Sequence, residues 1–262
     1  MAPASFPLLR IKATAGRSKT SQDRLRARYN GNVNGVVPFL IAIGGGLLPA
    51  LLWLWFWLRE DSRHPEPRRL IALAFLAGML AVALVIPIEE WVAGQLADQS
   101  QVFLAWAAIE ELMKFAVCSI AVLRRRDDDE PIDPVIYMVV VALGFAAAEN
   151  ALFLISPLSG LTLAQTIITG DYRFVGATLL HVLASAAIGA SIAFSFYKPR
   201  RTKVWFVLGG VILSIFLHSL FNLLIINTDA GEMVRTFSFV WIGLVGLLAI
   251  LEIIKRMPQR RV

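Results

Sequence analysis

The sequence predicts an all-α integral membrane protein, a polytopic bundle of about seven transmembrane helices. Of its 262 residues 57% are apolar and only 17% are charged, which is wrong for a soluble domain of this size and typical of a membrane protein. Apolar runs of about 20 residues, long enough to cross a bilayer, recur along the chain. No segment between them is long enough for a second folded domain, so one helical membrane domain is expected.

The seven expected helices follow one another with short connections. They cover residues 35–58, 70–88, 102–123, 134–156, 174–197, 204–227 and 236–254. The chain is therefore divided into a basic flexible N-terminal tail over residues 1–34, a functional transmembrane domain over 35–254 and a basic cytoplasmic tail over 255–262. No sequence repeat marks the parallel halves of a transporter.

Lysine and arginine are distributed unevenly between the two sides of the predicted bundle. Fifteen lie on one side, in residues 59–69, 124–126, 198–203 and 255–261. The opposite connections hold only Arg173 and Arg235. Because cytoplasmic loops carry the excess of positive charge, the first set is assigned to the cytoplasm. The basic tail before Gly35 conflicts with this assignment, and its side stays open.

The net charge of +6 is the cationic excess that is usual for membrane-protein loops. No basic stripe is interleaved with exposed aromatic residues, as binding of nucleic acid would require. The expected surroundings are the lipid bilayer, with no nucleic-acid partner.

Three charged residues interrupt the apolar run of the third predicted helix. Each of Glu110, Glu111 and Lys114 costs roughly 2.5 to 3.5 kcal/mol near the middle of a span, whereas a strongly apolar residue returns only about 0.3 to 0.6 kcal/mol. This helix is therefore marginal alone and must be held by its neighbours. Lys114 follows the two glutamates by four and three residues, so it can pair with either on one helix face.

The next three predicted helices also carry polar residues, next to small ones. Glu149 and Asn150 follow Gly144 and Ala148, whose spacing of four allows a close approach of helices. His181 belongs to a series of residues spaced four apart, whose other members are small: Ala177, Ser185 and Gly189. Ser214, His218 and Asn222 have the same spacing in the following helix. Each helix therefore presents a polar group on a face that is expected to meet a neighbour.

The depth of these polar residues in the membrane favours function over a purely structural ion pair. Counted along the predicted helices at about 1.5 Å per residue, Glu110, Glu149, His181 and His218 lie roughly 10 to 14 Å below the outer boundary. These four residues therefore lie in one layer, in the outer half of the membrane. An ion pair with a purely structural role would not require polar residues of four helices to share one depth. Glu89 and Glu90, at the end of the second helix, are interpreted as boundary residues.

Four motifs in this order on successive helices resemble the PrsW family of intramembrane proteases. They are EELMK at 110–114, GFAAAEN at 144–150, the histidine of TLLHVLAS and HSLFN at 218–222. The PEP at 65–67 is similar to the first loop of that family, and a weaker similarity reaches the CAAX-prenyl endopeptidases. The resemblance implies a multi-pass protein of the bacterial plasma membrane that cleaves membrane-bound protein substrates, anti-sigma factors among them.

Peptide-bond hydrolysis, which the resemblance implies, requires an activated water, a group that stabilises the oxyanion and a proton for the leaving amine. The candidate catalytic residues are Glu110, Glu111, Lys114, Glu149, Asn150, His181, His218 and Asn222. Glu110 is assigned as the base that Glu111 and Lys114 hold in place, although the two glutamates could exchange roles. Glu149 is the second carboxylate, and His181 would orient the water or donate the proton. His218 and Asn222 would stabilise the oxyanion.

A metal-dependent mechanism remains the main alternative. Zinc would use Glu110, Glu149, His181 and His218 as ligands, and a zinc-bound water would serve the same reaction. The sequence has no HExxH or other compact ligand pair, and the nearby Lys114 disfavours a cation. A glutamic-type enzyme without a cofactor is therefore favoured over a metalloprotease.

Two other classes of function, a transporter and a scaffold, and two other nucleophiles are less consistent with the sequence. A proton-coupled transporter would bury glutamates and histidines in one layer, but no pair of broken helices in corresponding halves supports it. A catalytically idle scaffold would not need the complete polar set. Ser185 and Cys118 are interpreted as packing residues and not as nucleophiles.

The orientation yields a direct prediction. A cysteine introduced between Arg124 and Asp133 should react with a membrane-impermeant maleimide only when the cytoplasmic side is exposed, because this loop carries the positive charge. Labelling of intact cells at this loop would overturn the outer-leaflet position of the polar layer.

Overall fold

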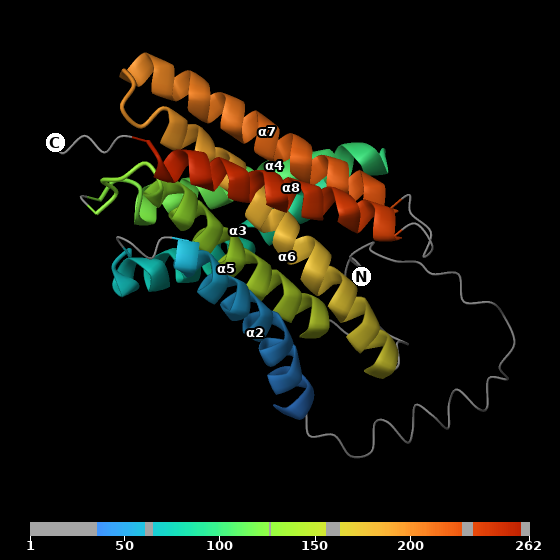
Figure 1. Ribbon diagram of the computed structural model, residues 1–262. Helices are drawn as coiled ribbons and strands as arrows, with labels where there is room; N and C mark the ends of the chain where they lie inside the picture. Colours follow the sequence, from blue (N-terminus) through green and yellow to red (C-terminus); the bar gives the residue numbers. More distant parts are fainter. Residues whose placement is uncertain (1–35, 61–64, 126, 156–162, 227–232, 258–262) are drawn as a thin grey trace, which may run out of the picture.

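The computed structural model is a bundle of long helices (Figure 1). It describes residues 36–60, 65–125, 127–155, 163–226 and 233–257. The predicted tail over residues 1–34 and the last five residues of the chain lie outside these ranges. Within the described ranges the secondary structure is entirely helical, which confirms the predicted fold class.

Seven helices occupy the described part of the chain. They are α2 (Val36–Glu60), α3 (Arg68–Ala93), α4 (Gln99–Ala121), α5 (Asp133–Ile155), α6 (Leu163–Phe194), α7 (Arg200–Ile226) and α8 (Met233–Lys255). Each overlaps one predicted span. Six of them are long and apolar enough to cross a membrane, and α4 is the exception. Its three central charges account for this, as the sequence predicts.

Helix α5 forms the centre of the bundle. It packs against α2, α3 and α6, and every side chain from Val135 to Leu143 is buried. Helix α4 contacts α3, α5, α6 and α7, so the charged helix is enclosed by four neighbours. Figure 1 shows α2 and α8 on opposite sides of the α5 and α6 pair, and α8 contacts α6 and α7. Polar residues on α4, α5, α6 and α7 can therefore meet inside the bundle.

Glycines bring neighbouring helices to α5 at backbone contact distance. A Cβ atom on Gly144 would lie 2.0 Å from the Phe75 carbonyl oxygen of α3, and one on Gly78 would lie 2.0 Å from the Val141 carbonyl oxygen of α5. On α6, a Cβ atom on Gly189 would lie 2.6 Å from the Cα of Val135. The predicted close approach at Gly144 is confirmed, and it joins α5 to α3.

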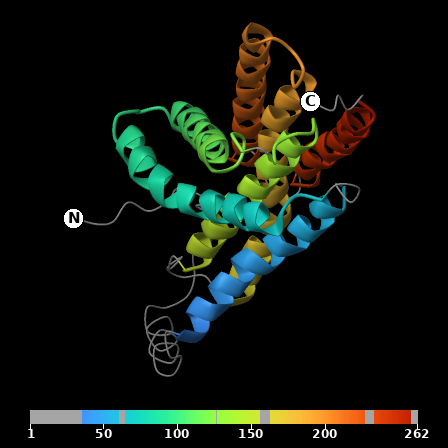
Figure 2. The same cartoon turned by 90° about the vertical axis from the view of Figure 1, so that its left-hand side faces the viewer.

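The connection between α3 and α4 sets the position of the charged helix. Pro87 lies inside α3, where proline removes a backbone hydrogen bond and favours a bend. Figure 2 shows α3 curving along its length toward the start of α4. Asp98 caps α4 by accepting the backbone N–H of Ser100 at 2.9 Å. The Trp106 indole N–H of α4 donates to the Glu89 carbonyl oxygen of α3 at 3.1 Å, which ties the two helices together.

The close contact of α3 and α5 can be tested with two alanine substitutions. G144A should lower the melting temperature of the purified protein in detergent, because the added methyl group cannot be accommodated without separating the helices, at a cost of about 1 to 3 kcal/mol. G209A, in α7, is the matched control, because no described atom lies within 4 Å of its added Cβ. This control should be neutral or slightly stabilising. Equal effects of the two substitutions would contradict the helix contact as described.

Candidate active site

Helix α4 supplies the three charged side chains at the centre of the site. The Lys114 ammonium donates to Glu111 Oε1 at 2.7 Å and to Glu110 Oε2 at 3.2 Å. The side chains of Lys114 and Glu111 are both 0% exposed, whereas that of Glu110 is 12% exposed. The pairing predicted from their spacing is therefore confirmed, and it involves both glutamates.

Glu111 accepts hydrogen bonds from three helices. Its Oε1 accepts from Lys114 of α4 and from His218 Nδ1 of α7, the latter at 2.8 Å. Its Oε2 accepts from the hydroxyls of Ser185 of α6 and Ser214 of α7, both at 2.9 Å. Four donors occupy the lone pairs of this carboxylate, so it is satisfied as an anion and has no free position for another ligand.

The partners of His181 identify its tautomer. Its Nδ1 lies 2.8 Å from the Lys114 ammonium nitrogen, and its Nε2 lies 2.8 Å from Glu149 Oε2. An ammonium group can only donate, so Nδ1 must accept and the ring proton must be on Nε2, which donates to Glu149. His181 therefore connects Lys114 to Glu149, and both of its nitrogens are engaged.

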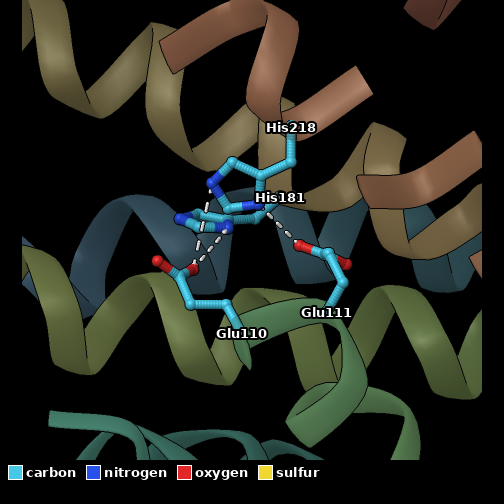
Figure 3. Close-up of side chains that lie close together, drawn as sticks. All are labelled: Glu110, Glu111, His181 and His218. Atoms are coloured by element: carbon cyan, nitrogen blue, oxygen red, sulfur yellow. Dashed lines mark hydrogen bonds and ion pairs between the residues drawn. The ribbon is translucent and has the colours of Figure 1, made fainter. Parts of the chain in front are cut away.

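His218 has one nitrogen engaged and one facing the other polar groups. Because the Glu111 carboxylate accepts, Nδ1 of His218 carries the proton of that hydrogen bond. Its Nε2 lies 3.9 Å from Glu110 Oε2, beyond direct hydrogen-bonding distance. The two imidazole rings pack edge to face with centroids 5.0 Å apart. Figure 3 shows both rings above the two glutamates of α4, with the Glu110 carboxylate directed toward both histidines and that of Glu111 toward His218.

The exposure of the carboxylates indicates where the group opens. The side chain of Glu149 is 30% exposed, whereas those of both histidines are only 3% exposed. Glu110 lies between these extremes. A water molecule or a substrate would therefore reach the group beside Glu110 and Glu149, while Glu111 and Lys114 stay behind them.

Two predicted site residues lie apart from this group. The Asn150 amide donates to the Thr178 hydroxyl at 3.1 Å, which links α5 to α6. Asn222 is partly buried one turn after His218, and no described hydrogen bond joins its side chain to the group. The structure thus brings together six of the eight candidates, and the catalytic roles of all eight stay predictions.

One buried carboxyl near the site was not predicted. Glu89 was interpreted as a boundary residue, but the structure buries it, and its carboxyl hydrogen-bonds with Glu110 and interacts electrostatically with Glu149 and Lys114. The reason is helical periodicity, because Val82, Val85 and Glu89 share the buried face of α3 while Glu90 is exposed. This spacing of Glu89 with two apolar residues is the sequence signal that could have predicted its burial. The expected packing role of Cys118 agrees with its complete burial among apolar residues.

Four side chains of the site carry atoms that could act as ligands of a metal ion. Glu110, Glu111, His181 and His218 each offer a ligand atom, and these atoms lie within 4.8 Å of one another. As the side chains lie, however, Glu111 already accepts four hydrogen bonds and His181 uses both nitrogens. Only Glu110 and His218 Nε2 retain open positions. Residue types and spacing suit zinc, but this arrangement of hydrogen bonds does not fit it.

The buried ion pair predicts a non-additive effect on stability. K114M should lower the free energy of unfolding by about 3 to 5 kcal/mol, because it leaves the buried Glu111 carboxylate without its cation. The double variant E111Q/K114M should recover part of that loss, since neither buried charge remains. Thermal unfolding in detergent measures both. A double variant less stable than K114M would contradict the pairing.

Comparisons with known proteins show the family of this chain. The model of the family described as "PrsW family intramembrane metalloprotease" matches residues 66–251. Protease PrsW of Geobacillus kaustophilus is 28% identical over 192 residues, which cover 71% of this chain and 80% of that protein. The Protease PrsW of Clostridioides difficile is 27% identical over 197 residues, covering 71% and 78% of the two chains.

Protease PrsW of Bacillus subtilis is 27% identical over 192 residues, which cover 70% of this chain and 82% of that protein. No solved structure matches the chain. The family match covers α3 to α7 and most of α8, and so includes every helix that supplies the site. With six helices able to span a membrane, the chain is a multi-pass bacterial membrane protein that belongs to the PrsW family of intramembrane proteases.

Proposed function

We propose that this protein hydrolyses peptide bonds of membrane-bound proteins with a water molecule that Glu110 activates. The observation that carries the proposal is the contrast between adjacent glutamates. Glu111 is saturated by four donors, whereas Glu110 has an accessible carboxylate facing both histidines. A general base needs a free acceptor position within reach of its water, which Glu110 offers and Glu111 does not.

The steps follow from the positions of the side chains. Glu110 takes a proton from the water, and the water oxygen attacks the carbonyl carbon of the scissile peptide bond. His218 would donate from Nε2 to the oxyanion in its doubly protonated imidazolium form, whose Nδ1 proton stays bonded to Glu111, and Asn222 lies one turn away to add a second donor. The carbon–nitrogen bond then breaks as the proton held by Glu110 passes to the leaving amine, which completes the hydrolysis.

His181 is assigned a positioning role in this scheme. Both of its nitrogens are hydrogen-bonded, so it holds the Lys114 ammonium and the Glu149 carboxylate instead of contacting the water. Lys114 in turn fixes the carboxylate of Glu110. These hydrogen bonds connect the proposed base to Glu149, the most exposed carboxylate of the group. The proposed substrate is a single-span membrane protein, and an anti-sigma factor is the class that the family resemblance suggests.

A zinc-dependent mechanism is the second candidate, because four ligand atoms lie within 4.8 Å of one another and the matching family is described as a metalloprotease. Bound zinc would lower the pKa of a coordinated water and polarise the scissile carbonyl. Glu110 and His218 would hold it with their open positions, together with His181 or Glu149 after these exchange partners. The hydrogen bonds of Lys114 and His181 favour the metal-free mechanism.

The two mechanisms predict different responses to chelation. We expect purified protein in liposomes to cleave a labelled single-span substrate at an unchanged rate after treatment with a strong zinc chelator. E110Q should lower kcat by about a hundredfold or more, because the base is lost. E149Q should lower it by about tenfold, because only the charge of an accepting group is removed.

E90Q is the matched control, because Glu90 is an exposed glutamate of α3 with no described contact to the site residues. It should leave cleavage unchanged. Loss of activity on chelation with recovery on zinc would replace the metal-free mechanism, and full activity of E110Q would refute the assignment of the base.

A further inference from the structure

The proposed mechanism leaves the buried carboxyl of Glu89 without a role. This side chain is 8% exposed, and among the described residues none donates a hydrogen bond to its Oε1. A buried carboxyl oxygen without a donor is destabilising, and most buried polar atoms in folded proteins have a partner. A donor supplied by a bound molecule would explain why this atom is tolerated.

The position of Glu89 places this atom at the edge of the active site. Its carboxyl hydrogen-bonds with that of Glu110 and interacts electrostatically with Glu149 and the Lys114 ammonium, which leaves Oε1 without a donor among the described residues. Its backbone is held by Trp106, whose indole N–H donates to the Glu89 carbonyl oxygen. Trp106 precedes Glu110 by one helical turn, so Glu89 is fixed against the part of α4 that carries the proposed base. This oxygen is itself buried, beside the two carboxylates that a substrate would reach, Glu110 and Glu149.

A substrate of an intramembrane protease would bring donors that need such an acceptor. Within a membrane the backbone N–H groups of a helix are satisfied only by its own carbonyl groups, because lipid offers no alternative. Unwinding the helix around the scissile bond leaves several of these N–H groups without an acceptor. In a medium of low polarity each such group raises the free energy of the bound substrate. A site that cleaves an unwound segment must therefore supply acceptors, and Glu89 Oε1 is a buried acceptor without a donor.

We propose that Glu89 is a substrate-binding residue whose Oε1 accepts a hydrogen bond from a backbone N–H of the unwound substrate beside the scissile bond. This inference rests on the proposed protease function and assigns a residue of α3, a helix that supplies none of the other site residues. Glu89 transfers no proton in this role. It holds the extended segment next to Glu110, so the substrate contacts carboxylates on both α3 and α4.

Three substitutions test the acceptor. E89M keeps a similar volume and removes the acceptor, E89Q keeps a neutral amide oxygen that can accept, and E90M changes the exposed neighbour as a control. We expect E89M to lower kcat/KM by about tenfold to a hundredfold, chiefly through KM, because a hydrogen bond to the bound substrate is lost. E89Q should retain more activity than E89M, and E90M should match the wild type.

Thermal stability separates this role from a structural one. E89M removes an oxygen to which no described residue donates, together with the hydrogen bond between the Glu89 and Glu110 carboxyls, so its melting temperature in detergent should stay close to that of the wild type. A melting temperature that falls together with activity would identify Glu89 as a structural residue and overturn the proposal. Wild-type kcat/KM in E89M would overturn it as well, and so would E89Q no more active than E89M, which would mean that the carboxyl acts through its charge.

The substrate offers an independent test. In a synthetic single-span substrate, single peptide bonds near the cleavage site are replaced by esters, which removes one N–H at a time. One replacement should slow cleavage by the wild type but have little further effect on E89M, because both changes remove the same hydrogen bond. Independent effects at every position would overturn the inference. If E110Q cleaves as well as the wild type, the proposed function itself fails, which is a different outcome from these.

Discussion

The buried carboxylate of Glu111 is the group around which the site is organised. A charge in the interior of a membrane bundle is tolerated only when its attraction to partners offsets the loss of hydration, which requires that all its lone pairs are used. Lys114 from the same helix, Ser185 from α6, and Ser214 and His218 from α7 meet this requirement. The same bonds fix α4 against α6 and α7 and orient His218. A helix too polar to be stable alone is thereby held where its second glutamate can act.

Glu110 and Glu111 are neighbours in sequence but lie in different surroundings. Successive residues on a helix point in directions about 100° apart, so one carboxylate faces the donors of α6 and α7 while the other faces the open side of the group. Lys114 contacts both and also meets the face of the Phe145 ring, with its nitrogen 4.1 Å from the ring centre. Two identical side chains therefore suit two tasks, because environment and not chemical type sets the role of a carboxylate.

The helices that carry the site are held by backbone contact, which limits their movement. Glycines at the crossings of α3 with α5 and of α6 with α5 bring the backbones together without intervening side chains. Helices packed in this way give a rigid frame, and groups on rigid elements keep their geometry. Within this frame the Oε1 atom of Glu89 is an exception, because no described residue donates a hydrogen bond to it. A buried acceptor without a donor calls for an explanation, and a substrate N–H would supply the donor that the free site lacks.

The sequence alone predicts the seven helices, because long and mostly apolar runs leave no other structure in lipid that satisfies the backbone. It also determined the pairing of Lys114 with the glutamates, since spacing fixes neighbours within one helix. The packing of the helices sets three further features: which glutamate is saturated, the hydrogen bond of Asn150 to Thr178, and the burial of Glu89 at the site. These facts depend on how far each helix is rotated about its axis and on which neighbour supplies the donors. That rotation is set by packing between helices, which spacing along one chain does not specify.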